Sequence, residues 1–192
     1  MPSIYEAYAI YAEQTINGLD TEEMKVGMPN RVFNVVESYY GDPDPEKALI
    51  NRLEDHNGER IRLKRGTYRV NGLSFLTMLS AGVPPVPPVP TQFLDDVYPG
   101  YCILFDANNP PLGLDDMKGV FCVGTMGTAY DGVPSIFDCV LNVENEFLDI
   151  SLGHQCSYNQ HGPGYDPRPR VYLRIGGSDF HVCARIAIFK IA

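Results

Sequence analysis

The residues of this sequence that could do chemistry are few. His154, Cys156 and His161 form the one group that resembles metal ligands, but their spacing matches no common zinc site, and a closed site would need a fourth ligand. His154 and Cys156 lie two residues apart on an expected strand, so their side chains would share a face, as a base and a nucleophile could. No acidic residue that could orient the imidazole lies nearby in the sequence. We therefore predict ordinary packing here, with no metal and no catalytic residue.

Acidic pairs are a second class of candidates, at Asp42 and Asp44, Asp95-Asp96, and Asp115-Asp116. Paired carboxylates can bind Ca²⁺, but none of these pairs has the central glycine and terminal glutamate of a calcium loop. The sequence also contains no Walker-type phosphate loop, no nucleophile elbow, no H-E-x-x-H and no glycine-rich dinucleotide turn. These observations predict a protein that is not an enzyme and that needs no cofactor.

Aromatic and acidic residues gather beside glycine and proline in expected loops. Loops of this composition can bind sugars in β-sandwiches, because a ring stacks on an apolar sugar face while a carboxylate accepts hydroxyl protons. Tyrosine is equally enriched at protein interfaces, so both interpretations stay open. The candidate contact residues are Phe93, Asp95, Asp96, Tyr98, Tyr130, Asp131, Tyr158 and Tyr165.

The elements that must position these loops are short strands. The 18 glycines and 16 prolines are spread between short apolar runs, which is typical of an all-β chain. Alternation is clearest at 61–64, and the other strands are expected over 4–12, 31–36, 67–78, 101–106, 119–125, 135–143, 147–155, 170–175 and 180–191. Residues 42–55 predict either a short helix capped by Asp44 or a strand that leads into a hairpin turn.

The last expected strand has two apolar faces. Val182, Ala184, Ile186 and Ile188 can point into a core, while the opposite face carries His181, Cys183, Arg185 and Phe189, with Ala187 among them. This opposite face is too apolar for open water, so we expect a partner or a loop to cover it.

Composition excludes several classes of function. The net charge of −9 argues against a nucleic-acid partner. Five cysteines without a C-x-x-C pair are expected to be free, mostly buried thiols made in a reducing cytoplasm. No apolar stretch reaches bilayer length and no signal peptide is visible, so we expect neither membrane insertion nor export. Without a repeat or a composition break, residues 1–192 are predicted to form a single domain, with an N-terminal strand and loop over 1–27 and a Pro-rich loop over 83–99.

The order of several segments resembles that of a group of bacteriophage virion proteins. The matching segments are Met28–Asn34 (W-x-x-R-x-L-N in the group), Arg60–Val70 (L-P-A-G-x-Y-x-I), Gly100–Asp106 (H-x-x-R-L-Y-N), Gly124-Thr125 (G-[ST]), His154–Cys156 (H-x-C) before Gly162-Pro163-Gly164, and Phe180–Ile191 (E-V-Y-x-x-I-x-I-x-K-I). Met28 replaces the group's tryptophan, Lys64-Arg65 replace its Pro-Ala, and 83–99 resembles an insertion. The group has trimeric jelly-roll heads similar to those of C1q and tumour necrosis factor.

The resemblance implies an all-β, antiparallel jelly-roll β-sandwich (C1q/TNF-like) of about eight to ten strands, with at most one short helix. It further implies a homotrimer in the virion, made in the host cytoplasm, with capsid or tail proteins and a host-surface glycan as partners. The leading function is host attachment. The alternative is a capsid decoration protein. One observation supports it, because the sequence has no coiled-coil or collagen-like shaft that could project a receptor-binding head. A carbohydrate-binding module ranks third.

Overall fold

The computed structural model describes residues 5–16, 30–75, 99–111, 117–128, 133–156 and 180–191. These residues form nine strands and one short 3-10 helix, η1. The strands are β1 (Ala7–Ile16), β2 (Val35–Tyr40), β3 (Ile50–Arg52), β4 (Ile61–Ser74), β5 (Pro99–Asp106), β6 (Val120–Val123), β7 (Gly127–Thr128), β8 (Ser135–Cys156) and β9 (Phe180–Lys190), and η1 covers Glu54–His56. Within these ranges, no helix is long and apolar enough to cross a bilayer.

The strands pair in the order β2-β1-β9-β4-β8-β5-β6, and β3 and β7 add to β4 and β5. Every pair is antiparallel. Most neighbours are not consecutive in sequence, as in β1 with β9 and β4 with β8, which is the wound connectivity of a jelly roll. The predicted antiparallel β-sandwich is confirmed, and its nine described strands fall within the expected number.

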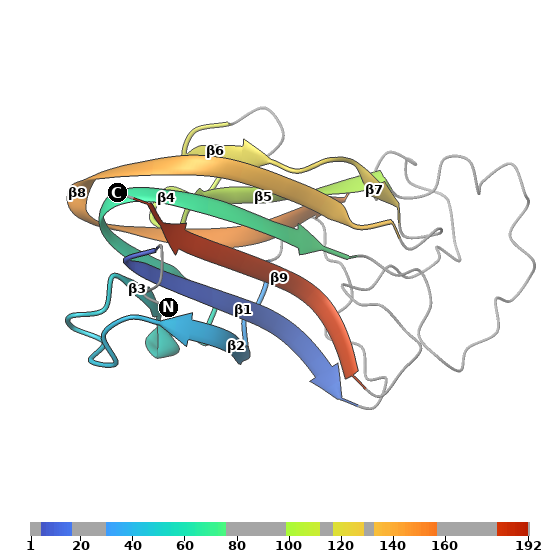
Figure 1. Ribbon diagram of the computed structural model, residues 1–192. Coiled ribbons are helices and arrows are strands. Elements are labelled where there is room, and N and C mark those ends of the chain that lie inside the picture. Colours follow the sequence, from blue (N-terminus) through green and yellow to red (C-terminus); the bar gives the residue numbers. More distant parts are fainter. Residues whose placement is uncertain are drawn as a thin grey trace, which may run out of the picture.

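Two long strands, β4 and β8, belong to both layers of the sandwich. Their register shifts where Lys64 and Gly66 of β4 face Phe147 and Val143 of β8. A bulge bends strands and lets them pass from one sheet to the other, and Figure 1 shows β8 curving back on itself at one end of the molecule. The first layer is β2-β1-β9 with residues 67–74 of β4 and 135–143 of β8, and the second contains β3, β5, β6, β7 and the other halves of β4 and β8.

The core lies between these layers and follows the alternation of the sequence. Leu63 and Val70 of β4, Leu104 of β5, Leu152 of β8 and Ile186 of β9 are all fully buried. Because successive side chains of a strand point to opposite faces, one side of each strand fills the core while the other faces outward.

The helix interpretation of residues 42–55 is wrong. Asp44 does cap a turn, since its side chain accepts a hydrogen bond from the Glu46 N–H at 3.0 Å and its carbonyl accepts one from Ala48. The chain then leaves the turn, because residues 50–52 pair with β4. Ladder hydrogen bonds to β4 therefore outweigh the local helix signal, and the alternative of a strand leading into a turn is confirmed.

Some strand boundaries also differ from expectation. The strand predicted over 31–36 lies at Val35–Tyr40, and the two strands predicted over 135–143 and 147–155 are one continuous strand. The strand expected over 170–175 and residues 83–98 of the Pro-rich loop lie outside the described residues.

Candidate functional site

The predicted loop contacts all lie outside the described ranges, as does His161. They are Phe93, Asp95, Asp96, Tyr98, Tyr130, Asp131, Tyr158 and Tyr165. Among the residues that are described, no group of His, Cys, Asp and Glu side chains could hold a metal ion.

His154 belongs instead to a buried polar cluster that the sequence did not reveal. The cluster, called the Arg31 cluster below, consists of Glu13, Arg31, Ser74 and His154, all with at most 5% exposure. Arg31 Nε donates to Ser74 Oγ at 2.8 Å, its NH1 group lies 3.4 Å from the Glu13 carboxylate, and its NH2 group donates to the Phe75 carbonyl. Ser74 Oγ lies 2.7 Å from His154 Nδ1.

The Arg31 cluster has two electrostatic consequences. Among the described residues, no group hydrogen-bonds to the buried Nε2 atom of His154, whereas Nδ1 lies against Ser74 Oγ. Burial, together with the neighbouring Arg31 guanidinium, holds the pKa of His154 well below its usual range. Burial also lowers the pKa of Arg31, against the attraction of Glu13. The cluster ties together the ends of β1, β4 and β8 and is closed to solvent, which is the arrangement of a structural network.

The last strand shows why one predicted interface residue was misplaced. Ala184, Ile186 and Ile188 face the core as expected, and Arg185 is exposed. A register shift between β9 and β1 falls where Glu13 pairs with Ala184 and Gln14 pairs with Val182. Because this bulge adds a residue, Cys183 turns inward and is fully buried. Cys183 therefore cannot contact a neighbouring subunit, and the strict alternation expected there is wrong.

Arg185 and Phe189 do share the outer face of the first layer. Phe189 packs on Tyr5, with ring centroids 4.9 Å apart, and on Tyr8 at 6.2 Å, while Tyr8 stacks on Tyr40 at 5.8 Å. Arg185 pairs with Glu37 at 2.6 Å. His181, the remaining residue of the predicted interface, lies in β9, and its side chain is outside the described part of the structure.

This face continues across β4 and β8 by register. Phe189 pairs with Arg69, which in turn pairs with Val140, and Arg185 pairs with Leu73, which pairs with Ile136. Directly opposite residues of an antiparallel pair point to the same side. Val140 is 62% exposed, Ile136 50% and Tyr40 48%. The residues that we call the outer face are Tyr8, Ile10, Tyr40, Leu73, Ile136, Val140, Ala187 and Phe189.

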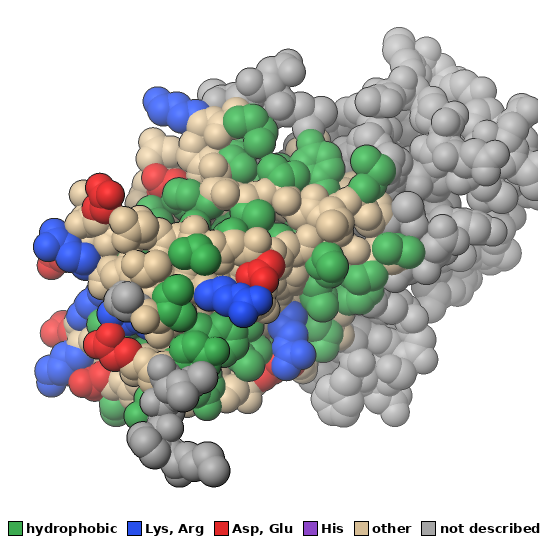
Figure 2. Space-filling view, turned by 45° about the horizontal axis from the view of Figure 1, so that its top comes forward, with side chains coloured by type: hydrophobic (Ala, Val, Ile, Leu, Met, Phe, Trp, Pro, Cys, Tyr) green, Lys and Arg blue, Asp and Glu red, His purple; other side chains and the backbone are tan. Residues whose placement is uncertain are grey.

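A second exposed apolar group follows β6 and the chain leading into β8. It consists of Phe121, Val123, Met126 and Val133 and is called the β6 edge. Figure 2 shows hydrophobic side chains spread over this side of the molecule, with a few charged side chains between them. On the outer face described above, the Arg69 guanidinium and the Asp138 carboxylate form an ion pair with an N–O distance of 2.6 Å.

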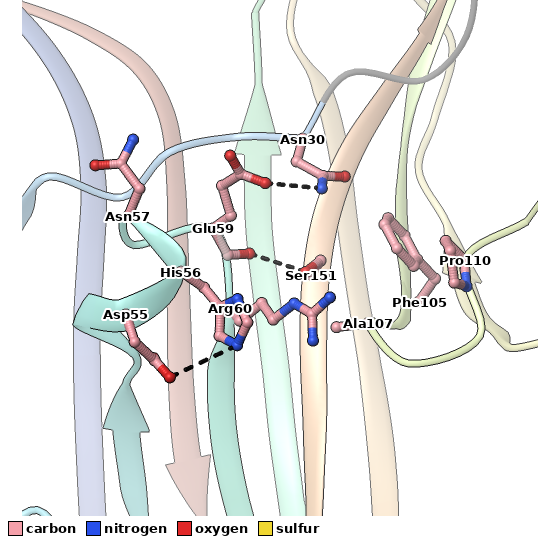
Figure 3. Close-up of a pocket in the computed structure, with 10 residues that line it drawn as sticks. All are labelled: Asn30, Asp55, His56, Asn57, Glu59, Arg60, Phe105, Ala107, Pro110 and Ser151. Carbon is pink, nitrogen blue, oxygen red and sulfur yellow. Dashed lines mark hydrogen bonds and ion pairs between the residues drawn. The ribbon is translucent and has the colours of Figure 1, made fainter.

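A small polar pocket lies between η1 and the turn that follows β5. Its volume is about 260 Å³, and Figure 3 shows the Arg60 side chain reaching across it toward Ala107. Asn30 Nδ2 donates to the Glu59 carboxylate at 3.1 Å, Ser151 Oγ donates to the Glu59 carbonyl at 2.9 Å, and Arg60 donates to Asn108 Oδ1 at 3.3 Å. The lining mixes donors and acceptors with the apolar Phe105 and Pro110, so a small polar ligand would suit it.

The turn beneath this pocket depends on Gly58. Its φ is +76°, and a Cβ there would lie 2.5 Å from the Phe33 carbonyl oxygen. The Gly58 carbonyl also accepts a hydrogen bond from the Phe33 N–H at 3.0 Å. Gly58→Ala should therefore lower the free energy of unfolding by about 2 kcal/mol, measured by urea denaturation. Gly41→Ala is the control, because its Cβ would meet side-chain atoms and no backbone, with the end of the Tyr39 side chain at 3.0 Å and the Ala7 Cβ at 3.6 Å; equal losses in both variants would contradict this account.

No protein-family model and no curated protein sequence matches the chain. Among solved structures, the chain is similar to a crystal structure of murine APRIL at pH 8.0, with a TM-score of 0.45 and 6% sequence identity, over 96% of this chain and 98% of that one. The strand order by itself defines the present chain as an antiparallel jelly-roll β-sandwich. A similarity at this level carries no information on ligand or partner.

Proposed function

We propose that this chain is a non-enzymatic bacteriophage virion protein that assembles as a homotrimer and acts in host attachment. The observation that carries the proposal is the outer face, where aromatic and aliphatic side chains of five strands lie on one exposed sheet surface. The ion pairs Arg69–Asp138 and Arg185–Glu37 lie among these side chains, and exposed apolar side chains bordered by charged groups are typical of sites of association.

The presence of two apolar surfaces, which adjoin where Thr125 hydrogen-bonds with Ile136, is compatible with a closed ring. A cyclic trimer needs two different patches on each subunit, because each contact joins one patch to the other patch of the next copy. The outer face and the β6 edge are two such patches. The number three and the virion setting are supported by the order of sequence segments that resembles trimeric phage jelly rolls.

Host attachment requires a surface that remains free in the trimer. The small polar pocket between η1 and the β5 turn, called the Arg60 pocket here, is formed by residues of neither the outer face nor the β6 edge. Its mixture of carboxylate, amide, hydroxyl and guanidinium groups suits the hydroxyls of a glycan.

Assembly is tested by placing a charge in the outer face. We expect the protein to be a trimer at micromolar concentration, and Ile136→Asp to weaken assembly by roughly a hundredfold, because the residue directly opposite is Leu73 and the new carboxylate would be buried without a partner. Light scattering coupled to size-exclusion chromatography measures this. Met117→Asp is the matched control, since Met117 is 53% exposed, close to the 50% of Ile136, and belongs to neither apolar group. A monomeric wild-type protein would refute the proposal.

Attachment is tested with labelled protein on susceptible host cells and on empty capsids. Binding to cells, lost after periodate treatment of their glycans and reduced by Arg60→Ala, is the expected result. Binding to capsids without binding to cells would instead identify a decoration protein.

A further inference from the structure

Two of the arginines that the structure describes have no carboxylate partner, Arg60 and Arg65. Arg65 is exposed and donates to the Glu144 carbonyl at 2.9 Å. Arg60 is half-buried in the pocket, where its NH1 group donates to Asn108 Oδ1 at 3.3 Å. The other described arginines each form an ion pair with an aspartate or a glutamate: Arg31, Arg52, Arg62, Arg69 and Arg185. Arg60 therefore brings into the pocket a positive charge with which no described carboxylate pairs.

The Arg60 side chain is held in place from both ends. Just before β4, the Arg60 carbonyl accepts a hydrogen bond from the Leu53 N–H at 2.9 Å, which fixes the backbone. At the other end, the guanidinium bonds to Asn108, whose own N–H donates to the Asp106 carboxylate at 2.9 Å. Because these neighbours already fix its position, the guanidinium loses little conformational freedom when a ligand binds.

The two carboxylates of the lining have other neighbours. The Glu59 carboxylate accepts a hydrogen bond from Asn30 Nδ2 at 3.1 Å, and the Asp55 carboxylate lies 3.8 Å from His56 Nε2. Figure 3 shows these acidic side chains directed to Asn30 and His56, on the other side of the pocket from the Arg60 guanidinium. The pocket therefore has a cationic end, which suits a carboxylate, and an acidic end, which suits hydroxyl donors.

We propose that the ligand of the Arg60 pocket is an acidic sugar, a single ring that carries a carboxylate. The inference rests on the proposed glycan site and names its class of glycan. The carboxylate binds the Nε and NH2 groups of Arg60 through two charge-assisted hydrogen bonds, while NH1 keeps its bond to Asn108. The ring hydroxyls donate to the carboxylates of Asp55 and Glu59. A neutral sugar would satisfy the acidic end alone and leave the guanidinium without its anion.

The size and the apolar part of the lining fit one sugar ring. The volume of about 260 Å³ lies just below the roughly 300 Å³ at which sites for drug-sized ligands begin. Phe105 and Pro110 supply apolar contact between the two polar ends, as the C–H face of a sugar ring requires. A terminal acidic residue of a glycan chain therefore suits the pocket better than an internal segment of several sugars.

The test compares methyl glycosides that differ only in the acidic group. Uronates of the gluco, galacto and manno series, and the glycoside of N-acetylneuraminic acid, are each paired with the form whose carboxylate is reduced to an alcohol. Saturation-transfer NMR titrations with the full chain measure the dissociation constants. We expect about a millimolar for the best acid, roughly tenfold tighter than its alcohol, and a smaller ratio at high salt because ions screen the contact.

Two variants assign the preference to one side chain. Arg60→Gln can still bond to Asn108 but has no charge, so it should bind the acid and its alcohol about equally. Arg65→Gln removes the other arginine without a carboxylate partner, outside the pocket, and should keep the wild-type ratio. Equal affinities within every pair, no binding of any acid, or a preference that survives Arg60→Gln would each overturn the proposal.

Immobilised host-surface polysaccharide separates this inference from host attachment. Attachment to a glycan predicts that binding is lost after periodate treatment, whatever the charge of the sugar. The acidic-sugar inference predicts that binding is also lost after the carboxylates are reduced to alcohols. Binding that periodate abolishes and carboxylate reduction spares would refute the acidic sugar and leave attachment standing. A preference for the acidic glycosides without binding to host cells would refute attachment and support the ligand class.

Discussion

Arg31→Met should lower the free energy of unfolding by about 3–5 kcal/mol, because removing one partner of a buried ion pair leaves the other charge without compensation. Glu13 would lose its guanidinium partner, and Ser74 and the Phe75 carbonyl would each lose a donor in a site closed to solvent. Equilibrium unfolding in guanidinium chloride at a fixed protein concentration measures the loss.

A matched control is Lys47→Met, which removes the Lys47–Asp44 pair on the surface. Exposed ion pairs contribute little because water screens them, so the midpoint of that variant should hardly move. Were Arg31→Met to unfold at the same midpoint as the wild type, the Arg31 cluster would not be what ties β1, β4 and β8 together at this end.

Acidification should destabilise the protein through His154. Its pKa in the folded chain lies below its usual value, so under mildly acidic conditions the unfolded chain takes up a proton that the folded chain does not. Stability is then fully present above the unfolded pKa of about 6.5 and falls as the pH drops below it, by about 2 kcal/mol at pH 5.

The measurement compares the unfolding free energy at pH 7 and pH 5 in wild type, His154→Asn and His56→Gln. The asparagine can still bond to Ser74 but cannot be protonated, so most of the pH dependence in this window should disappear. His56 is exposed on η1, and its replacement should leave the dependence intact. An unchanged slope in His154→Asn would show that carboxylates alone cause the acid sensitivity.

Most strands could be predicted from local alternation, because burial of every second side chain leaves its mark within a few residues. Leu63, Val70, Leu104 and Ile186 were all predicted on strands and are all buried. Alternation fails where a bulge inserts a residue, as at Cys183, because a bulge is set by the partner strand rather than by the strand's own sequence. Residues 144–146 lie between two expected strands, 135–143 and 147–155, whereas they belong to β8, which continues there past a register shift with β4.

The Arg31 cluster could not have been predicted by any local argument. Ser74 lies 43 residues from Arg31 and 80 residues from His154 in the sequence. Only the pairing of strands brings them together, and a single sequence carries no direct record of that pairing. The available signal was an arginine directly before two apolar residues, Val32 and Phe33, but arginine is usually exposed and gave no reason to expect burial.

The position of β9 determines the order in which the first layer can form. β9 lies between β1 and β4 and pairs with both (Figure 1). During synthesis, β1 with β2 and β4 with β8 emerge from the ribosome as two separate pieces, each with an unsatisfied strand edge. They can be joined only when β9, much later in the chain, inserts between them. Folding is therefore expected to be slow, since contacts so distant in sequence carry a high loop-closure cost, and the waiting edges are where chaperones would bind or aggregation would begin.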